Sequence, residues 1–197
     1  DPVVSVTGHP QNNSETETWS QSASGQLALV SGPDGDDLYN GSTTSYPNHL
    51  ARINGSTGSV EWTYDHGNNV RAIAVSDDKS TVYIADGSNN VASIDVASSS
   101  SNWQTSPLSS FAAEMVLSDD GAYLYVVTDS NLQKIDATDG SVAWSKSHGQ
   151  SYANGVALDT SGNVYIGTND AGRVMSWDPS GSLRWDVAVT GATGVAA

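Results

Sequence analysis

The stretch LQKIDATDGSVAW, Leu132–Trp144, decides the fold of this 197-residue chain. It predicts one strand, a tight turn, and a second strand that ends in tryptophan. Two close copies occur elsewhere: LARINGSTGSVEW at Leu50–Trp62 and, one residue shorter in the turn, VMSWDPSGSLRW at Val174–Trp185. Together with Trp103, the tryptophans that close these units recur every 41 residues. Self-similarity at such a period indicates a repeat architecture.

Each repeat contains four short apolar stretches separated by turns rich in Gly, Asp, Asn and Ser, and no long segment shows a helical period. In the second repeat, Val70–Val75, Thr81–Ala85 and Val91–Val96 are predicted strands, and Ala97–Asn102 is a predicted serine-rich turn before Trp103. Four antiparallel strands in about 40 residues form one blade of a β-propeller. The predicted fold class is therefore all-β, a propeller with four full repeats and a split or incomplete fifth.

Aromatic residues occupy fixed positions in the repeats. Each predicted second strand carries a tyrosine, and each predicted fourth strand carries a tryptophan that we expect to pack between blades. The tyrosines are Tyr39, Tyr83, Tyr125 and Tyr165, and the tryptophans are Trp19, Trp62, Trp103, Trp144 and Trp185.

The opening unit resembles the tryptophan-docking repeat of quinoprotein-like (PQQ-like) propellers, whose pattern is roughly AxDxxTGxxxW. Asp136, Gly140 and Trp144 match this pattern, whereas Lys134 and Asp139 replace its alanine and threonine. The Leu50–Trp62 copy matches at four positions and departs at the alanine position. These are Asn54, Thr57, Gly58 and Trp62, with Arg52 in place of alanine.

Other repeats resemble different propeller families. Ala72–Ser98 looks like the YVTN repeat of archaeal surface-layer propellers, and Val156–Gly181 resembles blades of the NHL and SMP-30 type. The resemblance covers about Leu27–Ala197. It implies the propeller fold and leaves the activity open, because these families share blades and differ in function.

The ends of the chain leave the closure of the ring open. Residues 1–14 are predicted to form an N-terminal arm that completes the last blade, and residues 15–197 form the propeller. In a five-bladed ring with a shared blade, Gly191–Ala197 would be the inner strand, and Val3–Val6 and Thr16–Ser22 the outer strands. The alternatives are a piece of a six- to eight-bladed propeller and closure by another subunit.

The chain is strongly acidic, with 22 acidic residues, 7 basic residues and a net charge of -15. Such a surface repels nucleic-acid phosphate and anionic membranes, so we expect neither as a partner. It also suits concentrated salt, where the Debye length falls to about 3 Å. We therefore predict an origin in a halophilic archaeon or its virus. The alternative is an acidic extracellular domain of an ordinary organism.

The chain has no cysteine, which excludes disulfides, cysteine-ligated zinc and thiol nucleophiles. No apolar run approaches the ~20 residues needed to span a bilayer. The polar N-terminus does not read as a signal peptide, so an exported protein would be present here in a mature or excised form.

Acidic turns are the candidate cation sites. Asp34, Asp36 and Asp37 are the candidate ligands, since calcium takes several oxygen ligands from one compact loop. Their spacing does not reproduce an EF-hand, and aspartate is favoured in turns for its own hydrogen bonds. We therefore predict solvated turns and no resident cofactor.

Tyr46 and Pro47, in a polar insertion, are the predicted contact loop, with a passive surface loop as the alternative.

No residue pattern indicates catalysis. His66 and His148 each precede a glycine at the same position of two repeats and are predicted turn residues. The sequence carries neither a nucleophile motif nor a histidine and carboxylate grouping with metal-ligand spacing. We therefore predict no catalytic residue and no enzyme activity.

Four basic residues in predicted strands are expected to form local ion pairs, with an anionic glycan as the alternative partner. They are Arg71, Arg173, Arg184 and Lys134.

The sequence thus favours a non-enzymatic interaction propeller at a cell or virion surface. It would act in adhesion, receptor binding or assembly, with a protein or glycan partner or as a homo-oligomer. The alternatives are a metal- or quinone-dependent propeller enzyme and a scaffold protein of a larger complex.

Overall fold

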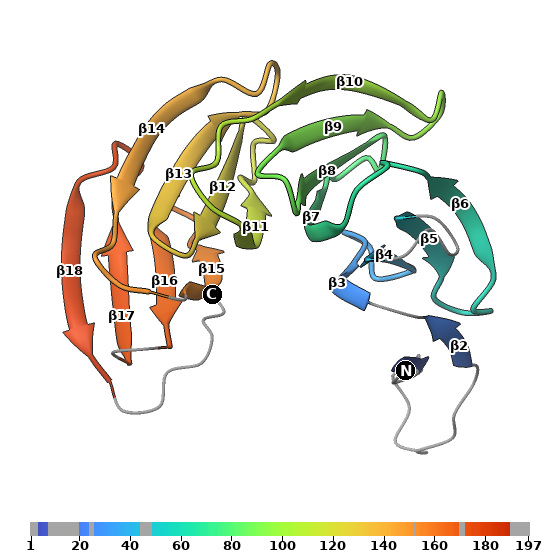
Figure 1. Cartoon of the computed structure of the whole chain (residues 1–197), viewed down its shortest axis with the longest axis horizontal. Helices are drawn as coiled ribbons and strands as arrows, with labels where there is room; N and C mark the ends of the chain where they lie inside the picture. Colours follow the sequence, from blue (N-terminus) through green and yellow to red (C-terminus); the bar gives the residue numbers. More distant parts are fainter. Residues whose placement is uncertain are drawn as a thin grey trace.

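The computed structural model describes residues 4–7, 20–23, 26–43, 49–151, 153–169 and 172–189. These residues form four four-stranded antiparallel sheets and one two-stranded sheet, with no helix among them (Figure 1). The predicted all-β propeller fold is therefore confirmed. In the same residues no helix is long and apolar enough to cross a membrane.

Each four-stranded sheet is one blade, and its strands follow one another from the propeller axis to the rim. Blade 1 consists of β3 (Gln26–Ser31), β4 (Asp37–Ser42), β5 (Leu50–Asn54) and β6 (Val60–Tyr64). Blade 2 consists of β7 (Val70–Val75), β8 (Thr81–Asp86), β9 (Val91–Asp95) and β10 (Ser100–Thr105). Blade 3 consists of β11 (Ala112–Leu117), β12 (Tyr123–Thr128), β13 (Asn131–Asp136) and β14 (Val142–Ser147). Blade 4 consists of β15 (Ala153–Leu158), β16 (Val164–Thr168), β17 (Arg173–Trp177) and β18 (Leu183–Ala188).

The first strands β3, β7, β11 and β15 lie next to one another around the axis, and the fourth strands form the rim (Figure 1). Because neighbouring strands are antiparallel, the turns between strands 1 and 2 and between strands 3 and 4 lie at one end of every blade. We call this end the hairpin face. The connections between strands 2 and 3, and from one blade to the next, lie at the other end, which we call the loop face.

A short hairpin precedes blade 1. In it, β1 (Val4–Thr7) pairs antiparallel with β2 (Ser20–Ala23), and Thr7 lies opposite Ser20. Thus a strand from the predicted N-terminal arm pairs with one from the predicted propeller. Several predictions fall outside the described residues and stay predictions. They concern Gly191–Ala197 as an inner strand, Trp19 as a docking residue, and Tyr46 and Pro47 as a contact loop.

The hydrophobic core lies between blades. One cluster joins blades 1 and 2 around Tyr39 and Ile84, a second joins blades 2 and 3 around Tyr83 and Leu124, and a third joins blades 3 and 4. The sheets of blades 2 and 3, which have a neighbour on each side, bury both of their faces in this way, as the nearly continuous burial of β8 and β12 shows. The propeller is therefore stabilised by the contact of each blade with the next.

The repeated aromatic positions meet on the sheets. In blade 2, Tyr83 lies opposite Ser93, and Ser93 lies opposite Trp103, so both rings stand on the same face. Their centroids are 6.2 Å apart. Blades 3 and 4 contain the equivalent pairs at 5.9 and 5.8 Å, which are Tyr125 with Trp144 and Tyr165 with Trp185.

Two predicted strand boundaries were wrong. The fourth strands do not end at their tryptophans: β14 continues past Trp144 to Ser147. The stretch Ala97–Asn102 is not entirely a turn, since β10 already begins at Ser100. Serines that face solvent at the rim are compatible with a strand, so the polar composition there does not mark a turn.

Candidate functional sites at the blade junctions and in the central channel

Each docked tryptophan joins its blade to the following one. The indole nitrogen of Trp103 donates a hydrogen bond to the carbonyl oxygen of Ala137 at 3.0 Å, in the turn between β13 and β14 of blade 3. The ring packs on Gly140, where an added Cβ would lie 2.8 Å from ring carbons. Gly140 also has a φ of 76°. Close approach and left-handed backbone together require glycine at this position.

The same junction recurs with small changes. The indole nitrogen of Trp144 donates to Pro179 O at 3.2 Å, and that of Trp62 donates to the Ser99 hydroxyl oxygen at 2.9 Å. Ser99 has a φ of 51° and takes the place that glycine holds in the other turns. Trp185, on the last described strand, is 38% exposed, and its indole nitrogen has no hydrogen-bond partner among the described residues.

The first strands line a channel along the propeller axis, made of three adjoining cavities. The middle cavity, of about 200 Å³, is lined from all four blades, by Leu29, Arg71, Glu114 and Asn154 among others. It shares lining residues with a cavity of about 380 Å³ at the loop face and with one of about 260 Å³ at the hairpin face. The channel therefore has two chemically different mouths.

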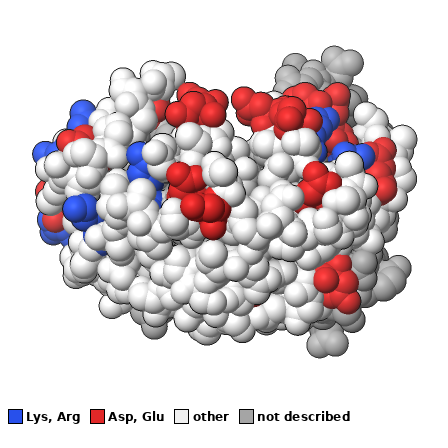
Figure 2. Space-filling view, turned by 90° about the horizontal axis from the view of Figure 1, so that it is seen from above, with Lys and Arg blue, Asp and Glu red and all other residues white. Residues whose placement is uncertain are grey.

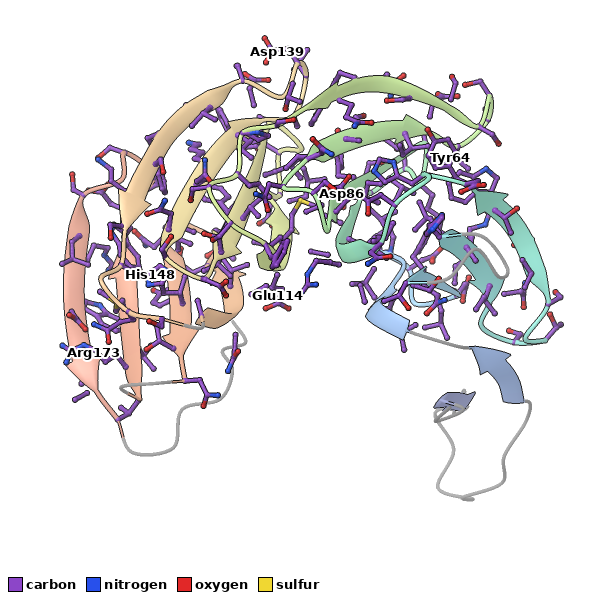
Figure 3. The ribbon with its side chains drawn as sticks, viewed as in Figure 1. Tyr64, Asp86, Glu114, Asp139, His148 and Arg173 are labelled. Carbon is purple, nitrogen blue, oxygen red and sulfur yellow. The ribbon has the colours of Figure 1, made fainter. Side chains whose placement is uncertain are left out.

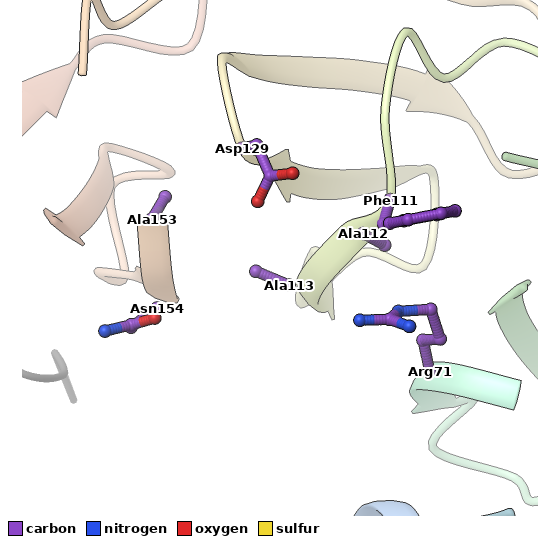
Figure 4. Close-up of a pocket in the computed structure, with 7 residues that line it drawn as sticks. All are labelled: Arg71, Phe111, Ala112, Ala113, Asp129, Ala153 and Asn154. Carbon is purple, nitrogen blue, oxygen red and sulfur yellow. The ribbon is translucent and has the colours of Figure 1, made fainter. Parts of the chain in front are cut away.

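The loop-face mouth is lined by Arg71, Phe111, Asp129, Asn154 and three alanines (Figure 4). The guanidinium carbon of Arg71 lies 4.8 Å from the centre of the Phe111 ring, which is a cation–π contact. Phe111 is the only phenylalanine of the chain, and it is 46% exposed. Sequence reasoning missed this group, because its residues come from three blades and share no motif.

Glu114 faces the channel from β11 (Figure 3). Its Oε2 accepts a hydrogen bond at 2.9 Å from the backbone N–H of Val156 on the first strand of blade 4. Burial raises the pKa of Glu114 above its usual value, and this hydrogen bond only partly opposes the shift. Glu114 therefore links two blades inside the channel.

The hairpin-face mouth has an apolar floor and an acidic rim. Ile73 and Val75 of β7 and Met115 of β11 form part of the floor, and Asp77 and Asp119 stand at the same position of successive blades. Neither carboxylate accepts a hydrogen bond from another described residue, whereas their neighbours Asp78 and Asp120 bind their own turns. Asp77 and Asp119 are therefore open to a partner.

Acidic residues gather on the hairpin face, and one edge of the molecule in Figure 2 is densely acidic. Many of these carboxylates accept backbone N–H groups of their own turns, which lowers their pKa. The largest effect is at Asp159, where the Asn163 side chain is the first cause of a pKa of about 2. The residues bound in this way include Asp78, Asp95, Asp120, Asp139, Asp159 and Asp178.

Two of the three candidate cation ligands of blade 1 contact a lysine. Lys79, in the first turn of blade 2, contacts the carboxylate of Asp34 and lies 2.9 Å from that of Asp37. The two carboxylates raise the pKa of Lys79. Asp34 also accepts the N–H of Asp36 at 3.1 Å. Among the described residues, no three His, Cys, Asp or Glu side chains are grouped to hold a metal ion.

The two histidines at the same repeat position lie in the connections that join one blade to the next, as expected for residues that follow the tryptophan strand. His66 Nε2 lies 3.0 Å from Asp86 Oδ2, and both side chains are buried. Burial opposes the charge of Asp86, but hydrogen bonds from Asn90 and His66 keep its pKa below the usual value. His148 is buried, its Nε2 lies 3.1 Å from Thr128 O, and burial lowers its pKa.

The ion-pair prediction for basic strand residues was right for one residue of the four. Arg173 pairs with Asp186 at 2.6 Å. Arg184 instead donates to the hydroxyls of Tyr165 and Ser176, Lys134 lies 3.8 Å from the centre of the Tyr123 ring, and Arg71 stacks on Phe111. Hydroxyl and aromatic partners replaced the expected carboxylates, because the acidic residues gather in the turns.

These blades, their docked tryptophans and the axial channel define a β-propeller repeat protein. The chain belongs to the PQQ_2 family, described as outer membrane protein assembly factor BamB, whose model matches residues 16–146 and 128–197. This agrees with the quinoprotein-like pattern of the opening unit. No curated protein sequence matches the chain.

Solved structures share the fold at low sequence identity. Hydrazine synthase of Kuenenia stuttgartiensis matches with a TM-score of 0.75 and 17% identity, over 92% of this chain and 53% of that one. U3-55K and the RRP9 WD40 repeats each match with a TM-score of 0.72 and 13% identity, over 83% of this chain and 52% and 51% of theirs. The chain thus spans about half the length of these structures.

Proposed function

We propose that the chain is a non-enzymatic interaction propeller that binds a basic protein partner on its hairpin face and serves as an assembly, adhesion or receptor-binding module. The single observation that carries this proposal is the hairpin-face mouth, where Asp77 and Asp119 stand open over an apolar floor. The name of the family, an assembly factor, is in line with such a role.

The shape and charge of this mouth suit the side chain of a lysine or arginine. Such a side chain buries its apolar stem and keeps its cationic head among polar groups. Ile73 and Met115 would contact the stem, and the two free carboxylates would pair with the head. The surrounding acidic turns would favour encounter with a basic surface and disfavour an acidic one.

The location that we propose is extracellular, on a cell surface or a virion of a salt-loving organism. The supporting observation is the net charge of -15 with no cysteine. Concentrated salt would screen long-range attraction but would weaken a contact ion pair in a partly enclosed mouth much less. The proposed partner therefore binds through close contacts.

Selection of a phage-displayed random peptide library on the purified chain tests the proposal. We expect enriched peptides to carry Lys or Arg next to an apolar residue. The double variant Asp77→Asn/Asp119→Asn should weaken their binding by about tenfold or more, because two contact ion pairs are lost. Binding should persist at high salt better than the binding of a simple polylysine.

The matched control is Asp95→Asn/Asp139→Asn, which removes the same charge from the same face. Both residues accept backbone N–H bonds of their own turns, and asparagine keeps that acceptor. This control should change binding less than about twofold. Equal losses of peptide affinity in both double variants would mean that only the net charge of the face matters, which would overturn the proposal. Enrichment of peptides without basic residues would overturn it as well.

A further inference from the structure

The loop-face mouth contains two opposite charges that have no hydrogen-bond or ion-pair partner within the described residues. The guanidinium of Arg71 has only the aromatic contact with Phe111, and the carboxylate of Asp129 accepts no hydrogen bond. Both line the cavity of about 380 Å³, and both point into it in Figure 4. This differs from the other arginines, each of which binds a carboxylate or hydroxyl partner.

Arg71 and Asp129 do not pair with each other. They come from different blades, β7 of blade 2 and the connection after β12 of blade 3, and no ion pair joins them across the cavity. A ligand that carries a negative and a positive group on one small skeleton could satisfy both at once. A simple anion would be attracted to Arg71 but repelled by Asp129. A simple cation would be attracted to Asp129 but repelled by Arg71.

The rest of the cavity wall is apolar and small. Ala112, Ala113 and Ala153 leave room between the charges, and the exposed part of the Phe111 ring offers an apolar surface beside Arg71. A cavity of this size is at the low end of the range of about 300–1,000 Å³ that is usual for ligand pockets. It therefore suits a small molecule better than a folded segment.

We propose that the loop-face mouth binds a small zwitterion of the amino-acid type. Its carboxylate binds the Arg71 guanidinium, its ammonium group binds the Asp129 carboxylate, and its apolar side chain lies against Phe111. The planar guanidinium binds a carboxylate through two parallel hydrogen bonds, which fixes the orientation of the ligand. This site lies at the opposite mouth from the proposed protein contact, so either proposal can fail alone.

The single phenylalanine makes a direct test possible. Growth with 4-fluorophenylalanine labels the chain at Phe111 only, so a ¹⁹F NMR spectrum gives one resonance in the cavity. The probes are L-leucine, L-leucinamide without the carboxylate, and 4-methylpentanoate without the ammonium group. We expect a saturable shift with L-leucine at millimolar concentration, and binding of each half-ligand at least about tenfold weaker.

Two variants assign the charges to the two ends of the ligand. Arg71→Gln should remove the preference for L-leucine over L-leucinamide, and Asp129→Asn should remove the preference over 4-methylpentanoate. Arg173→Gln, which breaks a distant ion pair with Asp186, is the control and should leave all three affinities unchanged. Far-UV circular dichroism checks that each variant is folded, and Arg71→Met, which keeps the apolar stem and removes the charge, replaces Arg71→Gln if that variant does not fold.

The absence of a saturable shift with L-leucine up to about 50 mM would overturn the proposal. So would equal weakening of all three probes in Arg71→Gln and Asp129→Asn, because that pattern means that the charges do not contact separate ends of the ligand. Binding of peptides at the hairpin face would be unaffected by either result.

Discussion

The indole nitrogen of Trp103 reaches across the blade boundary and donates a hydrogen bond to Ala137 O at 3.0 Å. This contact crosses between two sheets that share no backbone hydrogen bonds. The ring also packs on Tyr83 of its own blade and on Gly140 of the next. Trp103 therefore holds blade 2, to which it belongs, against blade 3.

Replacing Trp103 should destabilise the propeller strongly. We expect Trp103→Ala to lower the free energy of unfolding by about 3 kcal/mol, the low end for loss of a large packed aromatic residue, since part of the ring faces solvent. The matched control is Trp185→Ala, whose ring has no following blade among the described residues. We expect it to cost about 1 kcal/mol or less in urea unfolding. Equal costs would mean that inter-blade docking contributes little, or that Trp185 docks on a further blade.

The turn that receives Trp103 should be equally sensitive. Gly140→Ala adds a Cβ 2.8 Å from the ring at a φ of 76°, so steric overlap adds to backbone strain. We expect a loss of about 2–4 kcal/mol in thermal or urea unfolding. Gly121→Ala is the control: its φ is 69° and nothing lies within 4 Å of an added Cβ. It should cost only the strain, about 1–2 kcal/mol. Indistinguishable losses would show that the ring moves aside.

Much of the fold could be predicted because the sequence signals for each blade lie within the roughly 40 residues of that blade. The tryptophan period, the turn residues and the alternation of the strands all describe single blades, and each blade folds as its sequence pattern predicts. Where polarity was the only signal, the prediction was wrong: Ser100, Ser101 and Asn102 at the rim lie in a strand, because an exposed strand needs no apolar side chain. Ser99 in the place of glycine also shows that the docking turn tolerates a hydroxyl that binds the indole.

The channel could not be predicted in the same way. Arg71 lies in one repeat and Phe111 and Asp129 at two separate points of the next, and none stands in a motif. Only the packing of the first strands brings them to one cavity. Three of the four expected ion pairs did not form, because the acidic residues gather in the turns and the basic side chains meet hydroxyl or aromatic partners instead.

Acidic pH should destabilise the fold through His148. This side chain is buried, and burial lowers its pKa below the ordinary 6.5. The folded state therefore binds fewer protons than the unfolded chain just below pH 6.5, so stability contributed by neutral His148 is present above that pH and is lost as the pH falls. His148→Gln removes this dependence. We expect the stability difference between wild type and His148→Gln to shrink between pH 8 and pH 5 in parallel urea titrations. A difference independent of pH would show that His148 titrates alike in both states.

Glu114 should show the opposite dependence. Burial raises its pKa above the usual 4.5, although its Oε2 accepts the Val156 N–H at 2.9 Å. A raised folded pKa means that the neutral form is favoured, so the stability contributed by protonated Glu114 is present below pH 4.5 and is lost as the pH rises through the folded pKa. Glu114→Gln keeps an acceptor for Val156 and carries no charge. We therefore expect it to be more stable than wild type at pH 7 and equal to it near pH 4, measured by urea unfolding.

Glu114→Leu, which loses the acceptor as well, should not show this gain, because the Val156 N–H would be left without its partner. A Glu114→Gln variant that is less stable than wild type at pH 7 would show that the charged carboxylate itself stabilises the channel.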